Sequence, residues 1–197
     1  MPSIFPLLYA IGFTPWEGQT NSGPLPELLD RLPVGRALDV GCGTGEHAVF
    51  MAKRGWQVTG VDIVSKALDA ARERARTAGV TASTEFIKCD ATQLTDALTT
   101  RTFDLVFDVG CLHALNHKQH QAYAERISTV TRPGSTLLIM AATPRTGLGP
   151  NGVSDEQLAR MFGSTWTLSV VADADVTGRG ALRGAGFRWF ELHREQS

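Results

Sequence analysis

Short apolar runs alternate with amphipathic stretches over most of the chain. Strand-like runs are predicted at 37–40, 56–61, 84–88, 103–109 and 135–142, and helices at 46–54, 65–78, 91–98 and 117–130. Glycine follows two of these helices, at Gly55 and Gly79, which is typical of helix ends. Strands that alternate with helices through short connections predict a parallel sheet that is covered by helices on both faces.

The last third of the chain has a different pattern. Residues 143–153 are rich in glycine and proline and predict a loop, after which Ser154 caps a short helix with an acidic first turn. Two late strands are predicted at 166–172 and 187–193. They are joined by about fifteen glycine-rich residues, in which 181–185 could form a helical turn.

The first 35 residues differ from both parts. They contain six prolines, with Phe5, Tyr9, Phe13 and Trp16 between them. Prolines at this density break regular structure, although 27–32 could form a short helix. We interpret 1–35 as an N-terminal segment whose aromatic side chains pack on the core and close, with the 143–153 loop, over a ligand as a lid. Residues 36–197 then form the main domain.

Composition excludes several classes of function. The chain has 197 residues, of which 43% are apolar and 20% charged, and a net charge of −1. No basic excess is present to bind nucleic acid or an anionic membrane. No apolar run approaches the roughly 18 residues that cross a membrane. Three widely spaced cysteines match neither a disulfide framework nor a zinc site, so we expect a protein of the reducing cytoplasm.

The most informative stretch is the glycine-rich segment 39–46, with the sequence DVGCGTGE, between the first predicted strand and its helix. Such a loop lets the backbone approach a ligand closely. A dinucleotide fingerprint would need glycine or alanine where Glu46 stands, and a pyrophosphate here would meet the carboxylates of Glu46 and Asp39. The loop therefore favours a zwitterionic ligand without phosphate, such as S-adenosylmethionine, over the nicotinamide cofactor of an oxidoreductase.

Four acidic residues stand at or near the ends of predicted strands, namely Asp39, Asp62, Asp90 and Asp108. In an open parallel sheet, ligands bind beyond the carboxyl ends of the strands. A single aspartate there often only caps a helix or a turn. Four unrelated caps along one edge are a poorer explanation than one binding site.

These segments resemble the class I S-adenosylmethionine-dependent methyltransferases. Residues 39–45 are similar to the family's first motif, and the later motifs match at 61–62, 89–91, 103–108 and 132–135, in the same order. The resemblance implies an α/β, Rossmann-like fold with a seven-stranded, mostly parallel sheet whose last strand is antiparallel. It also implies that S-adenosylmethionine is the methyl donor and S-adenosylhomocysteine the product.

The resemblance also assigns residues. Asp62 would accept hydrogen bonds from the ribose hydroxyls, and Asp90 would meet the adenine amino group. The full set of cofactor-binding residues that we expect is Trp16, Asp39, Gly41, Gly43, Gly45, Asp62, Ile63, Asp90, Ala91 and Asp108.

The acceptor is suggested by a finer resemblance. Residues 13–17, FTPWE, followed by Gly18, are similar to a segment of bacterial small-molecule methyltransferases of the thiopurine and tellurite-resistance types, although those carry one more residue before the glycine. We expect methyl transfer to a hydroxyl, thiol or ring heteroatom of a small aromatic or heterocyclic acceptor. The alternatives are a C-methyltransferase of a quinone-like pathway and a non-catalytic module that binds the cofactor.

The sequence lacks the motifs of two other kinds of methyltransferase. Residues 108–111 read DVGC, without the two prolines typical of enzymes that methylate base amines. Asp108 with Asp173 or Asp175 lacks convincing metal-ligand spacing, so we predict no metal. We expect a monomer that acts on a small molecule, with no nucleic-acid or membrane partner.

His113 is the candidate catalytic residue. It follows the fourth predicted strand, where the reacting methyl group should lie, and histidine titrates in the range suited to a general base. The alternative is a packing histidine at the start of a helix. His117 and His120 are predicted to be solvated positions of the next helix.

Overall fold

A computed structural model describes residues 23–94, 98, 100–144, 152–174 and 186–196. The predicted lid therefore lies outside the described residues from its start to residue 22, and so do Trp16, Asp175, most of the 143–153 loop and the 181–185 turn. None of the helices in the described part is long and apolar enough to cross a membrane.

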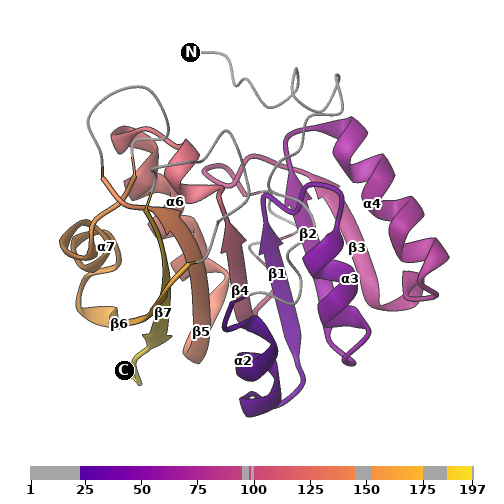
Figure 1. Ribbon diagram of the computed structural model, residues 1–197, viewed down its shortest axis with the longest axis horizontal. Coiled ribbons are helices and arrows are strands. Elements are labelled where there is room, and N and C mark those ends of the chain that lie inside the picture. Colours follow the sequence, from indigo (N-terminus) through magenta and orange to yellow (C-terminus); the bar gives the residue numbers. More distant parts are fainter. Residues whose placement is uncertain (1–22, 95–97, 99, 145–151, 175–185, 197) are drawn as a thin grey trace.

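The described strands form one seven-stranded sheet (Figure 1). The strands are β1 (Arg36–Val40), β2 (Gln57–Asp62), β3 (Thr84–Lys88), β4 (Phe103–Val109), β5 (Thr131–Ala142), β6 (Trp166–Asp173) and β7 (Phe187–Arg194). Their spatial order is β3-β2-β1-β4-β5-β7-β6, and β7 runs antiparallel to both β5 and β6. The predicted mostly parallel sheet with an antiparallel last strand is confirmed. The strand order reverses between β1 and β4, which is where ligands bind in open sheets of this kind.

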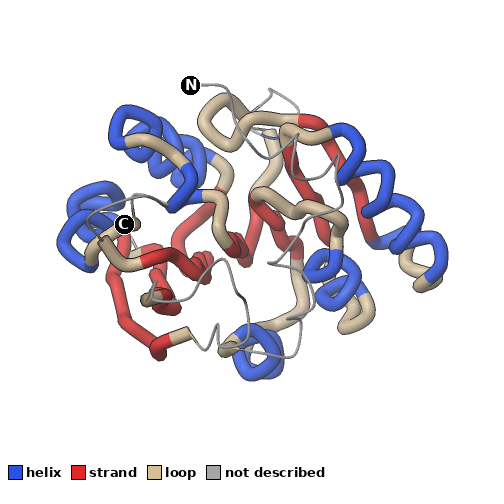
Figure 2. Tube along the Cα trace, turned by 45° about the horizontal axis from the view of Figure 1, so that its top comes forward, coloured by secondary structure: helices blue, strands red, loops and turns tan. Residues whose placement is uncertain are grey.

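Helices cover both faces of this sheet, as the sequence pattern predicts (Figure 2). The α-helices are α2 (Leu25–Arg31), α3 (Glu46–Ala52), α4 (Ser65–Thr77), α6 (His117–Thr129) and α7 (Asp155–Phe162). Short 3₁₀ helices are η1 (Thr81–Ser83), η2 (Leu112–Ala114) and η3 (Gly163–Thr165). Each face has its own buried apolar cluster, because successive side chains of a strand point to opposite faces.

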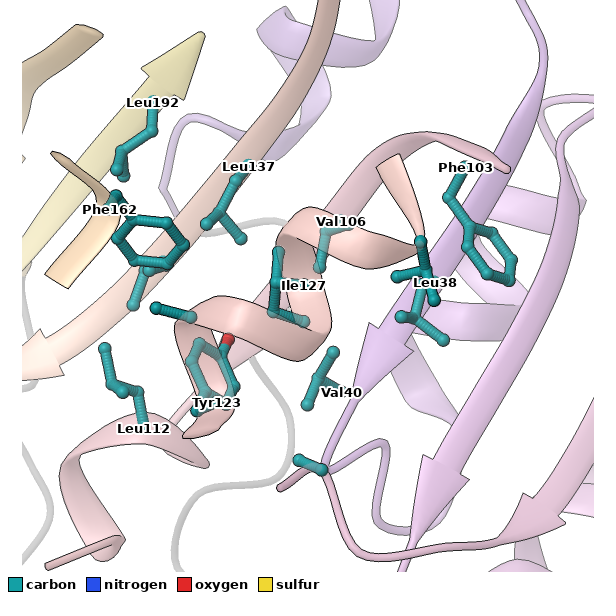
Figure 3. Packing of buried hydrophobic residues seen from close by; sticks show 14 of the residues in the cluster. Leu38, Val40, Phe103, Val106, Leu112, Tyr123, Ile127, Leu137, Phe162 and Leu192 are labelled. Carbon is teal, nitrogen blue, oxygen red and sulfur yellow. The ribbon is translucent and has the colours of Figure 1, made fainter. Parts of the chain in front are cut away.

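One cluster contains apolar residues of α2, α3 and α4, and the other contains those of α6 and α7. Figure 3 shows the second cluster, in which Tyr123 and Ile127 of α6 and Phe162 of α7 meet side chains of the central strands such as Val40 and Val106. All five side chains are at most 4% exposed. This packing fixes α6 beneath the end of β4, where the candidate site lies.

The predicted helix 91–98 is wrong in its first four residues. Residues 91–94 form a turn, because the Asp90 carboxylate accepts hydrogen bonds from both the backbone N–H and the hydroxyl of Thr92, at 2.8 and 2.7 Å. A short aspartate side chain that bonds two residues ahead competes with helix formation. Residues 95–97 and 99 lie outside the described part, so the rest of this helix stays a prediction.

Strand β5 begins four residues before the predicted start at Ser135. Its pairing with β4 shifts between Phe103 and Leu105, so Pro133 and Gly134 lie in a bulge inside the strand. The hydroxyl of Ser135 closes the bulge by donating to the carbonyl of Phe103 at 2.7 Å. Bulges of this kind bend a strand without ending its pairing.

Candidate cofactor-binding and active site

The glycine loop lies between β1 and α3 and is tied to the end of β2. The backbone N–H groups of Gly41 and Cys42 both donate to the carbonyl of Val61, at 2.9 and 3.0 Å. Gly41, Gly43 and Gly45 all have positive φ, between 53° and 74°. At Gly45 an added Cβ would lie 2.8 Å from the Cβ of Ala71 on α4, so both conformation and packing require glycine there.

Asp62 at the end of β2 supports this loop. Its Oδ2 accepts a hydrogen bond from the backbone N–H of Gly43 at 3.0 Å, and its Oδ1 accepts one from Val64 at 2.8 Å. An ionised carboxylate offers about four acceptor positions, so it can still accept from a ligand. Burial raises the pKa of Asp62, while the backbone N–H groups of Val64, Gly43 and Ile63 oppose the shift. The residue thus holds the loop and can still accept from paired hydroxyls.

Asp39, the last but one residue of β1, is a buried acid with an unpartnered oxygen. Its side chain is 3% exposed, and Oδ2 has no hydrogen-bond partner among the described residues. Burial, with the nearby carboxylates of Asp108 and Asp62, raises the pKa of Asp39 to about 8, against a backbone N–H of Ala48 that lowers it. A buried carboxyl of this kind is suited to a ligand that brings a positive charge.

The residues that follow β2 and β3 include the other predicted cofactor contacts. Asp90 is half-buried and holds the following turn through its bonds to Thr92, and Ala91 is 6% exposed within that turn. Ile63, directly after Asp62, is 41% exposed, which is unusual for a large apolar side chain in this structure. These residues follow β2 and β3, which are neighbours in the sheet, so the topology brings them to the same edge as the glycine loop.

Asp108 has a different place from the one that its strand-end position predicts. Its side chain is fully buried, and it accepts hydrogen bonds from the backbone N–H groups of Cys111 and Leu112, at 2.8 and 3.1 Å. The hydroxyl of Tyr123 donates to Oδ2 at 2.7 Å. The carboxylate thus holds the turn after β4 in place, and its predicted contact with the cofactor stays a prediction.

Replacing Tyr123 by phenylalanine should destabilise the protein by about 1.5–3 kcal/mol at pH 8, because a buried charged acceptor loses a hydrogen bond. Burial raises the pKa of Asp108 to about 6, and the tyrosine bond opposes that rise. Without this bond Asp108 should have a still higher pKa, so the variant should lose most stability where the carboxyl must ionise. Urea unfolding at pH 8 and pH 5 tests this. An equal loss of stability at both pH values would mean that the tyrosine stabilises the protein by packing and not by its bond to an ionised Asp108.

His113 lies in η2, two residues after Cys111, which contacts the glycine loop. An added Cβ at Gly41 would lie 2.9 Å from the Cβ of Cys111, so the turn after β4 presses against the loop after β1. The Nδ1 of His113 accepts a hydrogen bond from the backbone N–H of Ala142 at 3.3 Å. Its ring meets the edge of Phe187, with centroids 5.6 Å apart. Burial lowers the pKa of His113 to about 4. The ring is therefore uncharged at neutral pH, and the general-base role predicted from sequence stays a prediction.

Sequence reasoning missed Tyr123 and Phe187, which support Asp108 and His113. Neither carries a local motif, since one stands on the far helix and the other on the last strand. It also misplaced His120, which is 4% exposed, whereas His117 is exposed as predicted. Within the described ranges, no group of three or more His, Cys, Asp or Glu side chains is arranged to hold a metal ion.

The residues present fit S-adenosylmethionine. The loop offers backbone with positive φ at three glycines, Asp62 keeps acceptor capacity for hydroxyls, and Asp39 presents a buried oxygen without a partner in the described part of the chain. Arg74 does reach the loop, but it binds Thr44 through the carbonyl and the hydroxyl, at 2.9 and 3.0 Å. The arrangement favours a ligand with hydroxyls and a positive charge at one end.

Comparisons with known proteins point the same way. A family profile described as a methyltransferase domain matches residues 37–134. The chain is 28% identical over 193 residues to the 2-heptyl-1-hydroxyquinolin-4(1H)-one methyltransferase of Mycobacteroides abscessus, covering 93% of this chain and 82% of that protein. It is 31% identical over 155 residues to the probable thiol methyltransferase 2 of Arabidopsis thaliana, covering 77% and 67%.

A solved structure agrees in fold. It is the 1,6-didemethyltoxoflavin-N1-methyltransferase of Burkholderia thailandensis, with bound 1,6-didemethyltoxoflavin and S-adenosylhomocysteine. The TM-score is 0.73 at 20% identity, over 98% of this chain and 86% of that chain.

Proposed function

We propose, from the premise that this chain belongs to the class I S-adenosylmethionine-dependent methyltransferases, that it methylates a heteroatom of a small aromatic or heterocyclic acceptor. S-adenosylmethionine is the cofactor, and the chain is a methyltransferase of small molecules. We infer a heteroatom acceptor from the reactions that are named for three similar proteins. One acts on an N-hydroxyquinolone, one on thiols and one on a ring nitrogen.

Bound S-adenosylmethionine supplies a methyl group on an electron-poor sulfonium. The task of the protein is then to hold donor and acceptor in line and to exclude water. We propose that Asp62 accepts from the ribose hydroxyls, and that Asp39 faces the positively charged methionine end. The glycine loop brings backbone N–H groups to the same end. Asp90 and Ala91 would border the adenine, with Ile63 against its exposed face.

The acceptor would lie beyond the ends of β4 and β5. Phe187, Ala142 and His113 come together there. Apolar walls with a small number of polar groups are typical of small-molecule sites. The aromatic residues from Phe5 to Trp16 and the 143–153 loop remain our proposal for the lid over this acceptor.

The test is a methylation assay on a panel of acceptors. The purified chain would be incubated with S-adenosylmethionine and a hydroxyquinolone, an aromatic thiol, a phenol and a demethylated quinone, with products identified by mass spectrometry. We expect a mass increase of one methyl group on oxygen, sulfur or nitrogen. Methylation of the quinone carbon alone would establish the C-methyltransferase alternative. Cofactor binding with no product from any acceptor would contradict the proposal.

The proposal also includes the cellular compartment and the oligomeric state. Cys42, Cys89 and Cys111 are free thiols. This is in keeping with action in the reducing cytoplasm, which we propose as its compartment. We also propose that the chain acts as a monomer, because the donor and acceptor sites are built from its own strands. Light scattering of the purified protein tests that statement.

A further inference from the structure

The orientation of the His113 imidazole follows from the point at which β4 and β5 stop pairing. The register of β5 with β4 ends at Met140, so the N–H of Ala142 lies beyond the last pair on that side. A buried backbone N–H needs an acceptor, and the Nδ1 of His113 takes the place of the missing strand carbonyl, at 3.3 Å. A neutral imidazole that accepts at one nitrogen carries its proton on the other. Nε2 is therefore an N–H donor, and no hydrogen bond joins it to another described residue.

The surroundings keep this donor neutral and fixed. Phe187 of β7 meets the ring edge-on, and the backbone of Gly110 lies so close that an added Cβ would be 3.3 Å from Cε1. Burial is the cause of the lowered pKa of about 4, with no contribution from a charged side chain. Between pH 5 and pH 9 the imidazole thus keeps one tautomer and one proton. It cannot accept a proton at Nε2, because that position is already filled.

We propose that His113 donates a hydrogen bond from Nε2–H to the anionic oxygen or sulfur of an acceptor that reaches the site already ionised. The substrate class is then acidic phenols, N-hydroxy heterocycles and thiols in their anionic form. This inference rests on the proposed heteroatom methylation and narrows it. It gives His113 direct contact with the acceptor, as a donor in place of the base predicted from sequence.

The charge balance of the transfer agrees with this role. The anionic atom forms a bond to the methyl carbon as the bond from that carbon to the sulfonium breaks, and the electron pair stays on sulfur. The negative charge of the acceptor and the positive charge of the donor both disappear, and no proton moves. A preorganised N–H in an apolar setting aligns the anion for in-line attack without taking up its proton.

The nearest acids belong to other strands or have partners of their own. Asp108 faces α6 on the other side of the turn, where three donors hold its carboxylate. Asp39 and Asp62 belong to β1 and β2 and face the glycine loop. None of these carboxylates is among the causes of the lowered pKa of His113.

The tautomer can be measured directly. In protein labelled with ¹⁵N-histidine, long-range proton–nitrogen spectra distinguish Nε2–H from Nδ1–H, and the His113→Gln variant identifies the signal. We expect Nε2–H for His113 from pH 5 to pH 9, with S-adenosylhomocysteine bound. Adding 4-nitrothiophenol, which is ionised at neutral pH, should shift this nitrogen, whereas its S-methylated, neutral product should not. An Nδ1–H tautomer, or an Nε2 signal that does not shift when the thiolate is added, would overturn the inference.

Variants separate a donor from a base. Glutamine retains an N–H donor but cannot act as a base, whereas phenylalanine fills the space with neither function. We expect His113→Phe to lower both the affinity for 4-nitrothiophenolate and kcat/KM by about tenfold to a hundredfold, the range for one hydrogen bond to a charged group. His113→Gln should stay within about threefold of the natural protein, as should the exposed control His117→Gln. The pH profile should follow ionisation of the acceptor in all four proteins.

The possible results are distinguishable. If glutamine fails as badly as phenylalanine, and the loss grows with the pKa of the acceptor, His113 is a base and the inference is wrong. If phenylalanine has no effect, it is also wrong. Unchanged affinity for S-adenosylhomocysteine shows that each variant is folded. If the natural protein methylates no acceptor, the proposed function fails, and the thiolate titration still decides whether Nε2–H binds an anion.

Discussion

Replacing Asp62 by alanine is expected to weaken S-adenosylmethionine binding at least about a hundredfold. The carboxylate anchors Gly43 of the loop at 3.0 Å, and we assign its remaining acceptor capacity to the ribose hydroxyls. Each hydrogen bond to a charged group contributes roughly 1.5–3 kcal/mol, and about 1.4 kcal/mol is a tenfold change in affinity. The alanine variant loses the proposed hydroxyl contacts and the support of the loop together, so its loss should exceed that of one bond.

Asp62→Asn is the matched comparison. The amide keeps one oxygen that can accept from a backbone N–H, but it has no charge and places an NH₂ group where an acceptor stood. We expect an intermediate loss, between about tenfold and a hundredfold, in isothermal titration calorimetry with S-adenosylhomocysteine. Circular dichroism controls for folding. Unchanged affinity in the alanine variant would remove Asp62 from the cofactor site.

The cofactor side of the site could be predicted from sequence because its determinants are local. Gly41 to Gly45 lie in one loop, Asp62 is the last residue of β2, and Asp90 stands two residues after β3. Parallel strands bring their carboxyl ends to one edge, so short motifs far apart in the chain converge without any further information. The same reasoning gave the order of strands and helices from β1 to β5.

The acceptor side could not be predicted in the same way. The role of His113 depends on an N–H of Ala142 that is left over only because β4 ends before β5 does. It also depends on Phe187, which arrives because β7 inserts beside β5. Asp108 looks like a ligand contact from its position, yet the hydroxyl of Tyr123 occupies it from the opposite helix. Such pairings are set by tertiary packing, which no local pattern encodes.

Asp39→Asn should have opposite effects on stability and on cofactor binding. In the folded protein without cofactor the pKa of Asp39 is about 8, against an ordinary value of 3.8. A raised folded-state pKa means that the folded protein keeps a proton that the unfolded chain releases above about pH 4. Stability therefore falls as the pH rises from about 4 to about 8. Asparagine does not titrate, so the variant should be more stable at pH 8, by about 2–4 kcal/mol, and nearly unchanged at pH 4.

Cofactor binding should move the other way, because a positive charge beside Asp39 favours its ionised form and lowers its pKa in the complex. Affinity of the natural protein should then rise with pH up to about 8, with release of up to one proton, which calorimetry in two buffers of different ionisation enthalpy measures. The Asp39→Asn variant should bind S-adenosylmethionine at least about tenfold more weakly at pH 8, with a smaller deficit at pH 5.5 and no proton release. Urea unfolding at both pH values completes the test. A variant that is less stable at pH 8, or that still releases the proton, would show that the buried acid at the end of β1 is not the group that balances the cofactor's charge.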